Sequence, residues 1–182
     1  MVVAERPREI EADEIDGDKS YEVIDGVLVE KPMGAKSDEI ALTLGSRMRD
    51  FVRRKKLGRV FGSQTSYRNC FPHNALQIRK PDVSFVALDR LEDGVAPRGD
   101  FNIAPDLAVE VISPGDHYEY VEDKVFDYRM AGVKLIWIVN PKTKSAIIRR
   151  LDGSCSEVDV RGTLSGEDVV PGFECAVAEL FE

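Results

Sequence analysis

The segment from Asp106 to Pro114 reads DLAVEVISP, an apolar run that a single carboxylate, Glu110, interrupts. A short run of aliphatic, mostly β-branched residues that ends at a Ser-Pro turn signal predicts a buried strand over 107–112. A buried strand has no structural need for a glutamate, because taking an ionised group out of water costs several kcal/mol unless a cation, a metal or a hydrogen-bond donor compensates it. Glu110 is therefore either a functional group or half of a structural ion pair, with Lys124 or Arg79 as its partner.

The residues before this strand predict, in order, a β-hairpin, a long helix and two strands, at 21–31, 37–56, 59–68 and 76–88. Asp25-Gly26 is a typical two-residue turn for the hairpin. Apolar side chains at helical spacing define the helix, which we expect to end at Gly58. Pro81 interrupts the last strand, and because proline cannot donate a ladder hydrogen bond, we expect an edge, a bulge or a bend there.

The residues after it predict one helix and four short strands, at 118–130, 134–139, 145–150, 157–160 and 173–177. Gly132 follows the helix as its end signal. A right-handed crossover through the helix would make the strands at 107–112 and 134–139 parallel. The order predicts an α/β (α+β) fold with a mixed central β-sheet flanked by helices. The length of 182 residues suits a single domain over 21–182 after a charged arm over 1–20.

The composition excludes several classes of protein. Charged residues make up 32% and hydrophobic residues 43% of the chain, which is typical of globular domains and unlike disordered or membrane proteins. The net charge of −8 argues against coating nucleic acid by bulk charge. Cys70, Cys155 and Cys175 are far apart and form no CxxC pair, so neither a disulfide framework nor a zinc site is predicted. No segment resembles a signal peptide or a membrane helix, and we expect a cytoplasmic protein outside the membrane.

One dense group of basic side chains lies in and just after the second half of the helix predicted at 37–56. Its members are Arg47, Arg49, Arg53, Arg54, Lys55, Lys56 and Arg59. One interpretation is a solvated face whose cations complement the helix dipole. The other is a surface that contacts a phosphate backbone. No aromatic residues alternate with the cations, so a base-stacking surface is not predicted.

Three residues form a pattern that packing alone does not require: Asp82 after a proline, Glu110 in the apolar strand, and Lys124 in the following helix. Two carboxylates and one cation suit a divalent-metal phosphodiester site, because magnesium takes one or two protein carboxylates and fills its octahedron with water and phosphate oxygens. Lys124 borders the apolar stripe of its helix and can reach inward. The alternatives are a turn role for Asp82 and a surface position for Lys124.

Several segments together carry a resemblance to a known family: RKPDVSFV at 79–86, PDLAVEVISP at 105–114, Lys124 with Tyr128 and Ala131-Gly132-Val133, and WIVNP at 137–141. Their order and spacing, over roughly residues 21–150, resemble the Uma-two family of restriction endonucleases, a branch of the PD-(D/E)XK nuclease superfamily. The resemblance implies a restriction-endonuclease-like fold. It also implies a metal-dependent endonuclease that uses magnesium, or alternatively manganese, to hydrolyse phosphodiester bonds in DNA and leave a 5′-phosphate.

The same resemblance assigns roles to individual residues. Asp82 and Glu110 would be the metal ligands, the backbone carbonyl of Val111 a third ligand, and Lys124 the catalytic lysine. The chain departs from the superfamily pattern at Ile112, where the superfamily has lysine. Residues two apart share a strand face, so Ile112 lies beside Glu110 and cannot replace the lysine there.

A second departure is Ser37, where relatives often have histidine. Ser37 is expected to be an N-cap of the helix at 37–56, with Asp38 or Glu39 as substitutes for the histidine. The two histidines of the chain, His73 and His117, are expected to be loop residues.

These departures motivate an alternative function. The chain would then be a catalytically degenerate nuclease fold that binds nucleic acid or a protein partner. A weaker alternative is a sugar hydrolase that uses the two carboxylates as an acid and base pair. Many nucleases of this architecture are homodimers, and the apolar segment 175–181 is the candidate interface.

Overall fold

The computed structural model describes residues 20–31 and 34–182, so the expected N-terminal arm lies outside the described residues apart from Ser20. The helices of the described part are α1 (Ala35–Lys55) and α2 (Tyr118–Met130), with 3-10 turns η2 (Leu88–Arg90), η3 (Glu92–Gly94) and η4 (Val177–Leu180). The strands are β1 (Tyr21–Ile24), β2 (Val27–Glu30), β3 (Gly58–Gly62), β4 (Tyr67–Arg68), β5 (Ile78–Arg79), β6 (Val83–Ala87), β7 (Leu107–Val111), β8 (Leu135–Asn140), β9 (Ser145–Arg150), β10 (Cys155–Val158), β11 (Thr163–Ser165) and β12 (Glu174–Ala176). Within these ranges no helix combines the length and the apolar character that crossing a membrane requires.

Six strands form the central sheet, in the order β10-β9-β8-β7-β6-β3. β7 and β8 are parallel neighbours, with Val109 opposite Trp137, and the other pairs are antiparallel. The chain passes through α2 between these two strands, as the crossover argument predicts. The prediction of a mixed α/β fold with a mixed central sheet is therefore confirmed.

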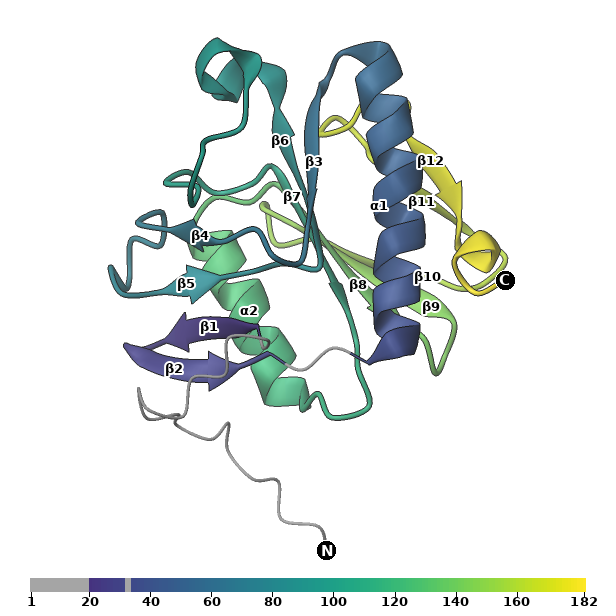
Figure 1. The fold of residues 1–182 in the computed structure, drawn as a ribbon. Coiled ribbons are helices and arrows are strands. Elements are labelled where there is room, and N and C mark those ends of the chain that lie inside the picture. The colour runs from purple at the N-terminus through teal and green to yellow at the C-terminus, as the bar shows by residue number, and fades with distance from the viewer. Residues whose placement is uncertain (1–19, 32–33) are drawn as a thin grey trace, which may run out of the picture.

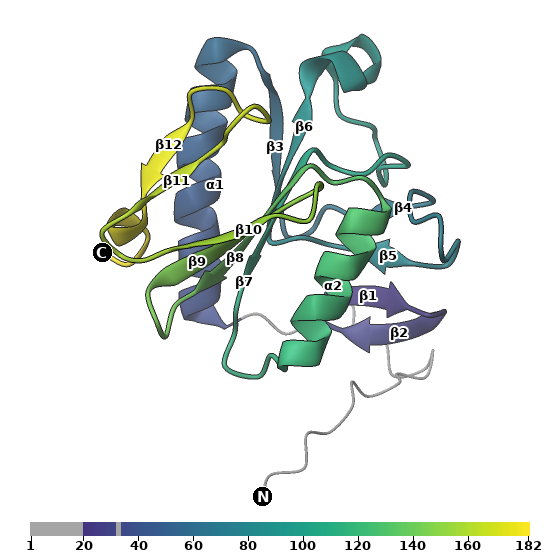
Figure 2. The same cartoon turned by 180° about the vertical axis from the view of Figure 1, so that it is seen from behind.

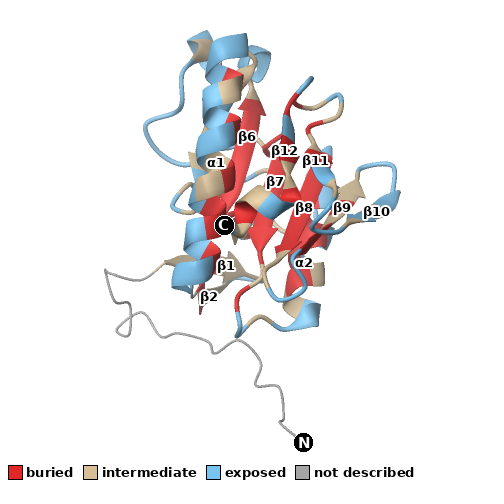
Figure 3. Cartoon of the chain, turned by 90° about the vertical axis from the view of Figure 1, so that its right-hand side faces the viewer, coloured by how far each residue is buried: buried red, intermediate tan, exposed pale blue. Residues whose placement is uncertain are grey.

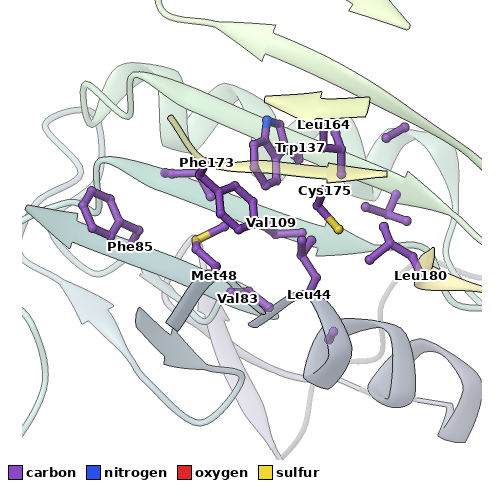
Figure 4. Close-up of a cluster of buried hydrophobic side chains, with 14 of the residues drawn as sticks. Leu44, Met48, Val83, Phe85, Val109, Trp137, Leu164, Phe173, Cys175 and Leu180 are labelled. Carbon is purple, nitrogen blue, oxygen red and sulfur yellow. The ribbon is translucent and has the colours of Figure 1, made fainter. Parts of the chain in front are cut away.

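One face of the central sheet is covered by α1 and by the C-terminal hairpin of β11 and β12 (Figure 1). Leu44 and Met48 of α1 pack against Val83, Val109 and Trp137 of the sheet (Figure 4). The inward side of α1 and the central strands are buried, and the outward side of the helix is exposed (Figure 3). This apolar packing fixes α1 against the sheet.

The C-terminal segment completes this same core. Cys175, Val177 and Leu180 are at most 2% exposed and belong to the cluster that packs under α1. Their apolar surface is used within the chain, so the prediction that 175–181 forms a dimer interface is wrong. β11 was not predicted, because three residues are too few to show a period.

The opposite face of the sheet carries α2, and a small sheet in the order β2-β1-β5-β4 lies beside this helix (Figure 2). Val121, Val125 and Tyr128 of α2 belong to the same buried cluster as Ala108 and Ile136 of the central sheet. The predicted hairpin at 21–31 forms β1 and β2 of the small sheet. The small sheet thus brings an N-terminal segment to the face that α2 covers.

The chain changes sheet at Pro81-Asp82. β5 before the proline belongs to the small sheet and β6 after it to the central sheet, so the predicted bend is confirmed. The strand predicted at 59–68 is likewise divided into β3 and β4, which lie in different sheets. The strand predicted at 157–160 lies at Cys155–Val158 instead.

Gly58 does not end the first helix as predicted. The helix ends at Lys55, its C-cap residue Lys56 adopts the left-handed conformation (φ 54°), and Gly58 is the first residue of β3. A Cβ at Gly58 would lie 2.2 Å from the carbonyl oxygen of Val86. Glycine is therefore needed here for the close approach of two strands rather than for a helix end.

Candidate functional site

The strand register places Asp82 beside Glu110. Val83 of β6 pairs with Val109 of antiparallel β7, and the Asp82 amide donates to the Val109 carbonyl at 2.9 Å. Extending the register by one residue sets the two carboxylates side by side, and strand alternation directs both toward α2. Each residue is 5% exposed. The two acids found in the sequence therefore form one buried pair.

Lys124 reaches this pair from α2. Its Nζ donates a hydrogen bond of 2.8 Å to Glu110 Oε2, and Lys124 is 4% exposed, so the alternative that it is a surface lysine is wrong. The Tyr128 hydroxyl, one turn later on the same face, donates to Glu110 Oε1 at 2.6 Å. Both oxygens of Glu110 are thus held by α2.

Lys31, which the sequence did not indicate, lies between the two carboxylates. It follows β2, is 7% exposed, and places Nζ 2.7 Å from Asp82 Oδ1 and 4.0 Å from Glu110 Oε2. Its ammonium also donates to the Lys80 carbonyl. A lysine at the end of a hairpin strand carries no local sign of burial, because only the folded chain brings it to the central sheet.

Glu22 of β1 is a second buried acid that the sequence interpretation missed. It is 0% exposed and accepts hydrogen bonds from the Lys80 amide at 2.7 Å, the Tyr120 hydroxyl at 2.8 Å and Arg79 at 3.2 Å. Lys124 Nζ lies 3.7 Å away. The signal was present, since Glu22 lies among the apolar residues of its strand as Glu110 does.

Arg79 extends the cluster away from Glu110. Its guanidinium is 0% exposed and binds Asp127 of α2, with Nε 2.5 Å from Oδ2. Gln77 Nε2 donates to the same oxygen at 2.6 Å, and His73 Nε2 lies 2.7 Å from the other. Arg79 pairs with Glu22 and Asp127, so the alternative of an Arg79–Glu110 ion pair is wrong, whereas the Lys124–Glu110 ion pair is formed.

The charges of the buried cluster do not cancel. Its carboxylates are Glu22, Asp82, Glu110 and Asp127, and its permanent cations are Lys31, Arg79 and Lys124. With all four carboxylates ionised and His73 neutral, four anions face three cations in this part of the described chain, and one formal negative charge remains. A divalent cation would find a site that attracts it.

The buried environment shifts several pKa values. Burial raises the pKa of Glu110 even though Lys124 and Lys31 act to lower it. Burial also acts to raise the pKa of Glu22, but attraction by Lys124, Arg79 and Lys31 outweighs it and lowers that pKa to about 2. For Lys124, burial acts to lower the pKa, and the surrounding carboxylates raise it above its ordinary value. Lys124 is therefore an ammonium at neutral pH.

The two oxygens of the Asp82 carboxylate have different partners. Oδ2 accepts the Val111 amide at 2.7 Å. Oδ1 faces the Lys31 ammonium, whose Nζ lies 2.7 Å away, and accepts no other hydrogen bond from the residues that the structure describes. A metal that bound Oδ1 would have to share this oxygen with the ammonium or displace it.

The donor set fits magnesium better than a metal that needs many side chains. Across 20–31 and 34–182, no three His, Cys, Asp or Glu side chains are grouped to hold a metal ion. A metal at this site would therefore take two carboxylates, Asp82 and Glu110, and complete its shell with backbone, water or phosphate oxygens. Magnesium accepts this combination. The part of the Val111 carbonyl as a third ligand stays a prediction.

The two departures from the superfamily pattern have clear positions. Ser37 is the third residue of α1, after the N-cap Gly34, so its predicted N-cap role is wrong. The Ser37 side chain is buried, donates to the Ile112 carbonyl at 3.2 Å and accepts from Ser113 at 3.0 Å. Ile112 packs against the core on the α2 side of the sheet, as its expected face requires.

The two histidines differ. His117 is exposed and precedes α2 as its N-cap residue, without a side-chain cap hydrogen bond. His73 also lies in a loop, as expected, but its contact with Asp127 joins it to the buried cluster.

Comparisons with known proteins concern the family and the fold. The sequence profile of the Uma2 family, described as "Putative restriction endonuclease", matches residues 8–178. No curated protein matches the chain. Among solved structures, the chain is similar to the crystal structure of a "putative nuclease belonging to DUF820" from Anabaena variabilis ATCC 29413, with a TM-score of 0.78 and 21% identity over 94% of this chain and 97% of that chain. At this identity the likeness establishes the fold.

Proposed function

Because the chain belongs to the Uma2 family, we propose that it is a magnesium-dependent endonuclease that hydrolyses phosphodiester bonds in DNA. The observation that carries the proposal is the buried pair of Asp82 and Glu110, with Lys124 hydrogen-bonded to Glu110 and Lys31 beside Asp82. Structural ion pairs would account for each carboxylate with its own lysine. They do not require the two carboxylates to lie side by side, as the register of β6 and β7 sets them.

Asp82 and Glu110 would hold the metal, with the Val111 carbonyl as a third ligand. A metal bound there lowers the pKa of a bound water and offsets negative charge on the phosphate. The Val111 amide orients Asp82 through Oδ2, and the Tyr128 hydroxyl orients Glu110 through Oε1. Asp82 is therefore oriented through Oδ2. Glu110 is held through both oxygens, Oε1 by Tyr128 and Oε2 by Lys124, so a metal would share Oε2 with the ammonium of Lys124.

Lys124 would act as a hydrogen-bond donor. Its raised pKa keeps it protonated, so it cannot accept a proton from water, and it suits the stabilisation of negative charge on the phosphate oxygens or the orientation of the attacking water. The water oxygen forms a bond to phosphorus and releases its proton to solvent, the bond from phosphorus to the 3′ oxygen breaks, and the 3′ oxygen takes a proton from solvent. The products carry a 5′-phosphate and a 3′-hydroxyl.

The test compares Asp82→Asn and Glu110→Gln with Asp159→Asn, which changes an exposed carboxylate outside the site. Plasmid DNA, single-stranded DNA and RNA are each incubated with protein and Mg²⁺ or Mn²⁺, with EDTA as the metal-free reference. We expect both site variants to reduce cleavage by about a hundredfold or more and Asp159→Asn to leave it unchanged. A wild-type protein that binds neither metal and cleaves none of the substrates would overturn the proposal.

A degenerate nuclease fold that binds nucleic acid or a protein partner is the second candidate. The position of Lys31 favours it, because its ammonium already offsets the two carboxylates. Calorimetry with MnCl₂ separates the two functions. Heat of binding that disappears in Asp82→Asn supports the nuclease, whereas a wild-type chain that binds an oligonucleotide but no Mn²⁺ supports the binding module.

We also propose that the active form is a homodimer, because two sites are needed to cut two strands. The interface would lie outside 175–181, whose apolar side chains are used in the core.

A further inference from the structure

A groove of about 880 Å³ lies between α1 and β3 on the side of the central sheet that faces away from α2. Figure 1 shows α1 and β3 side by side. β3 is the last strand of the sheet, so the groove is open at the sheet edge. Its floor includes Val83, and Asp82 of the candidate site lines it as well.

The walls of the groove carry four cations. Arg49 and Arg53 are four residues apart, which places them on one face of α1, and Lys56 is the C-cap residue that follows the helix. Arg59 belongs to β3, and its Nε donates to the Gly94 carbonyl at 2.8 Å. All four side chains are exposed and line the groove.

These cations are available to a ligand. Among the described residues, no carboxylate forms an ion pair with Arg49, Arg53 or Lys56, whereas Arg47 on another side of the helix is paired with Glu179. The chain as a whole has a net charge of −8. The positive charge of this group is therefore local to the groove, since the net charge of the protein has the opposite sign.

The cationic end of the groove lies away from Asp82. β3 pairs with β6 from Gly58 opposite Ala87 to Gly62 opposite Val83, so about four residues of strand, roughly 14 Å, separate Gly58 from the site. In a duplex this length corresponds to about four nucleotides of one strand. The groove thus includes Asp82 at one end, while the Asp82 carboxylate itself is directed across the sheet toward α2, and it carries its group of cations at the other end, at a distance of a few nucleotides.

We propose that this groove binds the sugar-phosphate backbone of the substrate strand on one side of the scissile phosphate. The proposal rests on the proposed nuclease function, since it uses the place of Asp82 in the reaction to orient the strand. The occupant is a nucleic acid because cations spaced along a groove match a chain of phosphates and because Asp82 of the candidate phosphodiester site lines the groove. Its contacts position the strand and do not read its sequence.

The test uses two double variants with the same change in charge. Arg49→Ala/Arg53→Ala removes cations that line the groove, and Arg54→Ala/Lys55→Ala removes exposed cations of the same helix turns that do not line it. Fluorescence anisotropy of a labelled DNA duplex, a single-stranded DNA and an RNA of equal length is measured in EDTA over a range of KCl concentrations. Thermal unfolding of both variants checks that the fold is retained.

We expect the groove variant to weaken duplex binding about tenfold or more, and its salt dependence to lose about 1.8 units of slope, or about 1.4 units for a single strand. The matched variant should change the dissociation constant less than about twofold. The probe that binds most tightly shows whether the groove prefers duplex DNA, single-stranded DNA or RNA. Equal losses in the two variants, no binding by the wild type, or tighter binding of poly-glutamate than of every oligonucleotide would each overturn the groove assignment.

The two proposals fail separately. If the wild type cuts DNA but the two double variants bind alike, the groove assignment is wrong and the nuclease function stands. If the wild type binds through the groove cations but cuts nothing under any metal, the nuclease function is wrong and the groove remains a nucleic-acid site.

Discussion

Lys31→Met should destabilise the metal-free protein and strengthen its affinity for a divalent metal. Methionine keeps the length and flexibility of the side chain and removes its charge. In the wild type, the Lys31 ammonium lies 2.7 Å from Asp82 Oδ1 and 4.0 Å from Glu110 Oε2. A metal that binds both carboxylates must compete with this ammonium, and in the variant it has no competitor.

The expected size follows from the distances. One pair of unit charges 4.0 Å apart attracts by about 4 kcal/mol at an effective dielectric constant of about 20. Removing one partner of a buried ion pair typically costs about 3–5 kcal/mol. We therefore expect the metal-free variant to lose about 3 kcal/mol, which lowers the melting temperature by about 6–12 °C for a chain of this size. In the metal-free variant, water would solvate the two carboxylates in place of the ammonium, and a metal would have to displace that water. The gain in Mn²⁺ affinity should therefore be about 10–100-fold, or about 1.4–2.8 kcal/mol.

Calorimetry gives the melting temperature without metal, and titration with MnCl₂ gives the dissociation constant. Lys36→Met is the matched control, because Lys36 pairs with Glu39 at the surface, with both side chains more than half exposed, and its loss should change neither quantity by much. The reasoning is refuted if Lys31→Met binds Mn²⁺ no more tightly than the wild type and melts at the same temperature.

Two further predictions concern Glu22 and Gly58. The folded-state pKa of Glu22, about 2, lies below its ordinary value of 4.5, so the stabilisation by its ionised form is complete above about pH 4.5 and lost as pH falls toward 2. Glu22→Gln should lower the free energy of unfolding at pH 7 by about 3 kcal/mol and flatten the acid limb of the plot of that free energy against pH. Urea titrations that show the same acid limb in both proteins would contradict this. Gly58→Ala should destabilise the chain by about 1–3 kcal/mol, because its Cβ would lie 2.2 Å from the Val86 carbonyl oxygen. Gly62→Ala, at the other end of β3 with no atom within 4 Å of its Cβ, should leave the stability unchanged. Equal losses of unfolding free energy in chemical denaturation would argue against a steric cause.

The Uma-two resemblance and the mixed α/β fold were both predictable because their signals are local. The apolar run of β7 and the helical spacing in α2 fix their elements without reference to distant residues. The ionisable residues that were predicted to meet were those with a local anomaly, such as Glu110 among apolar neighbours. Lys124 was placed on the correct face because its spacing from Val121 and Tyr128 is helical.

The partners of the two carboxylates were harder to predict. Lys31 is separated from Asp82 by 51 positions of sequence, and its burial depends on how the small sheet packs beside α2. Arg79 was one of two possible partners of Glu110 in the sequence, and its pairing with Glu22 and Asp127 instead depends on which elements meet across the two sheets.

The C-terminal segment is another case in which the sequence alone could not predict the contacts of a residue. Its apolar composition is evident in the sequence, but an apolar side chain can be buried equally well by its own chain or by a partner. Only the packing of Cys175, Val177 and Leu180 under α1 decided between these outcomes.

The sequence by itself determined most of the elements, the parallel direction of β7 and β8, and the three ionisable residues proposed for the site, because periodicity, turn residues and a charged residue in an apolar strand act over short distances. Tertiary structure alone decided that a lysine lies between the two carboxylates, and that Asp82 also lines a groove with four cations. Burial and electrostatic compensation depend on which distant segments meet in space, and a linear pattern does not contain that information.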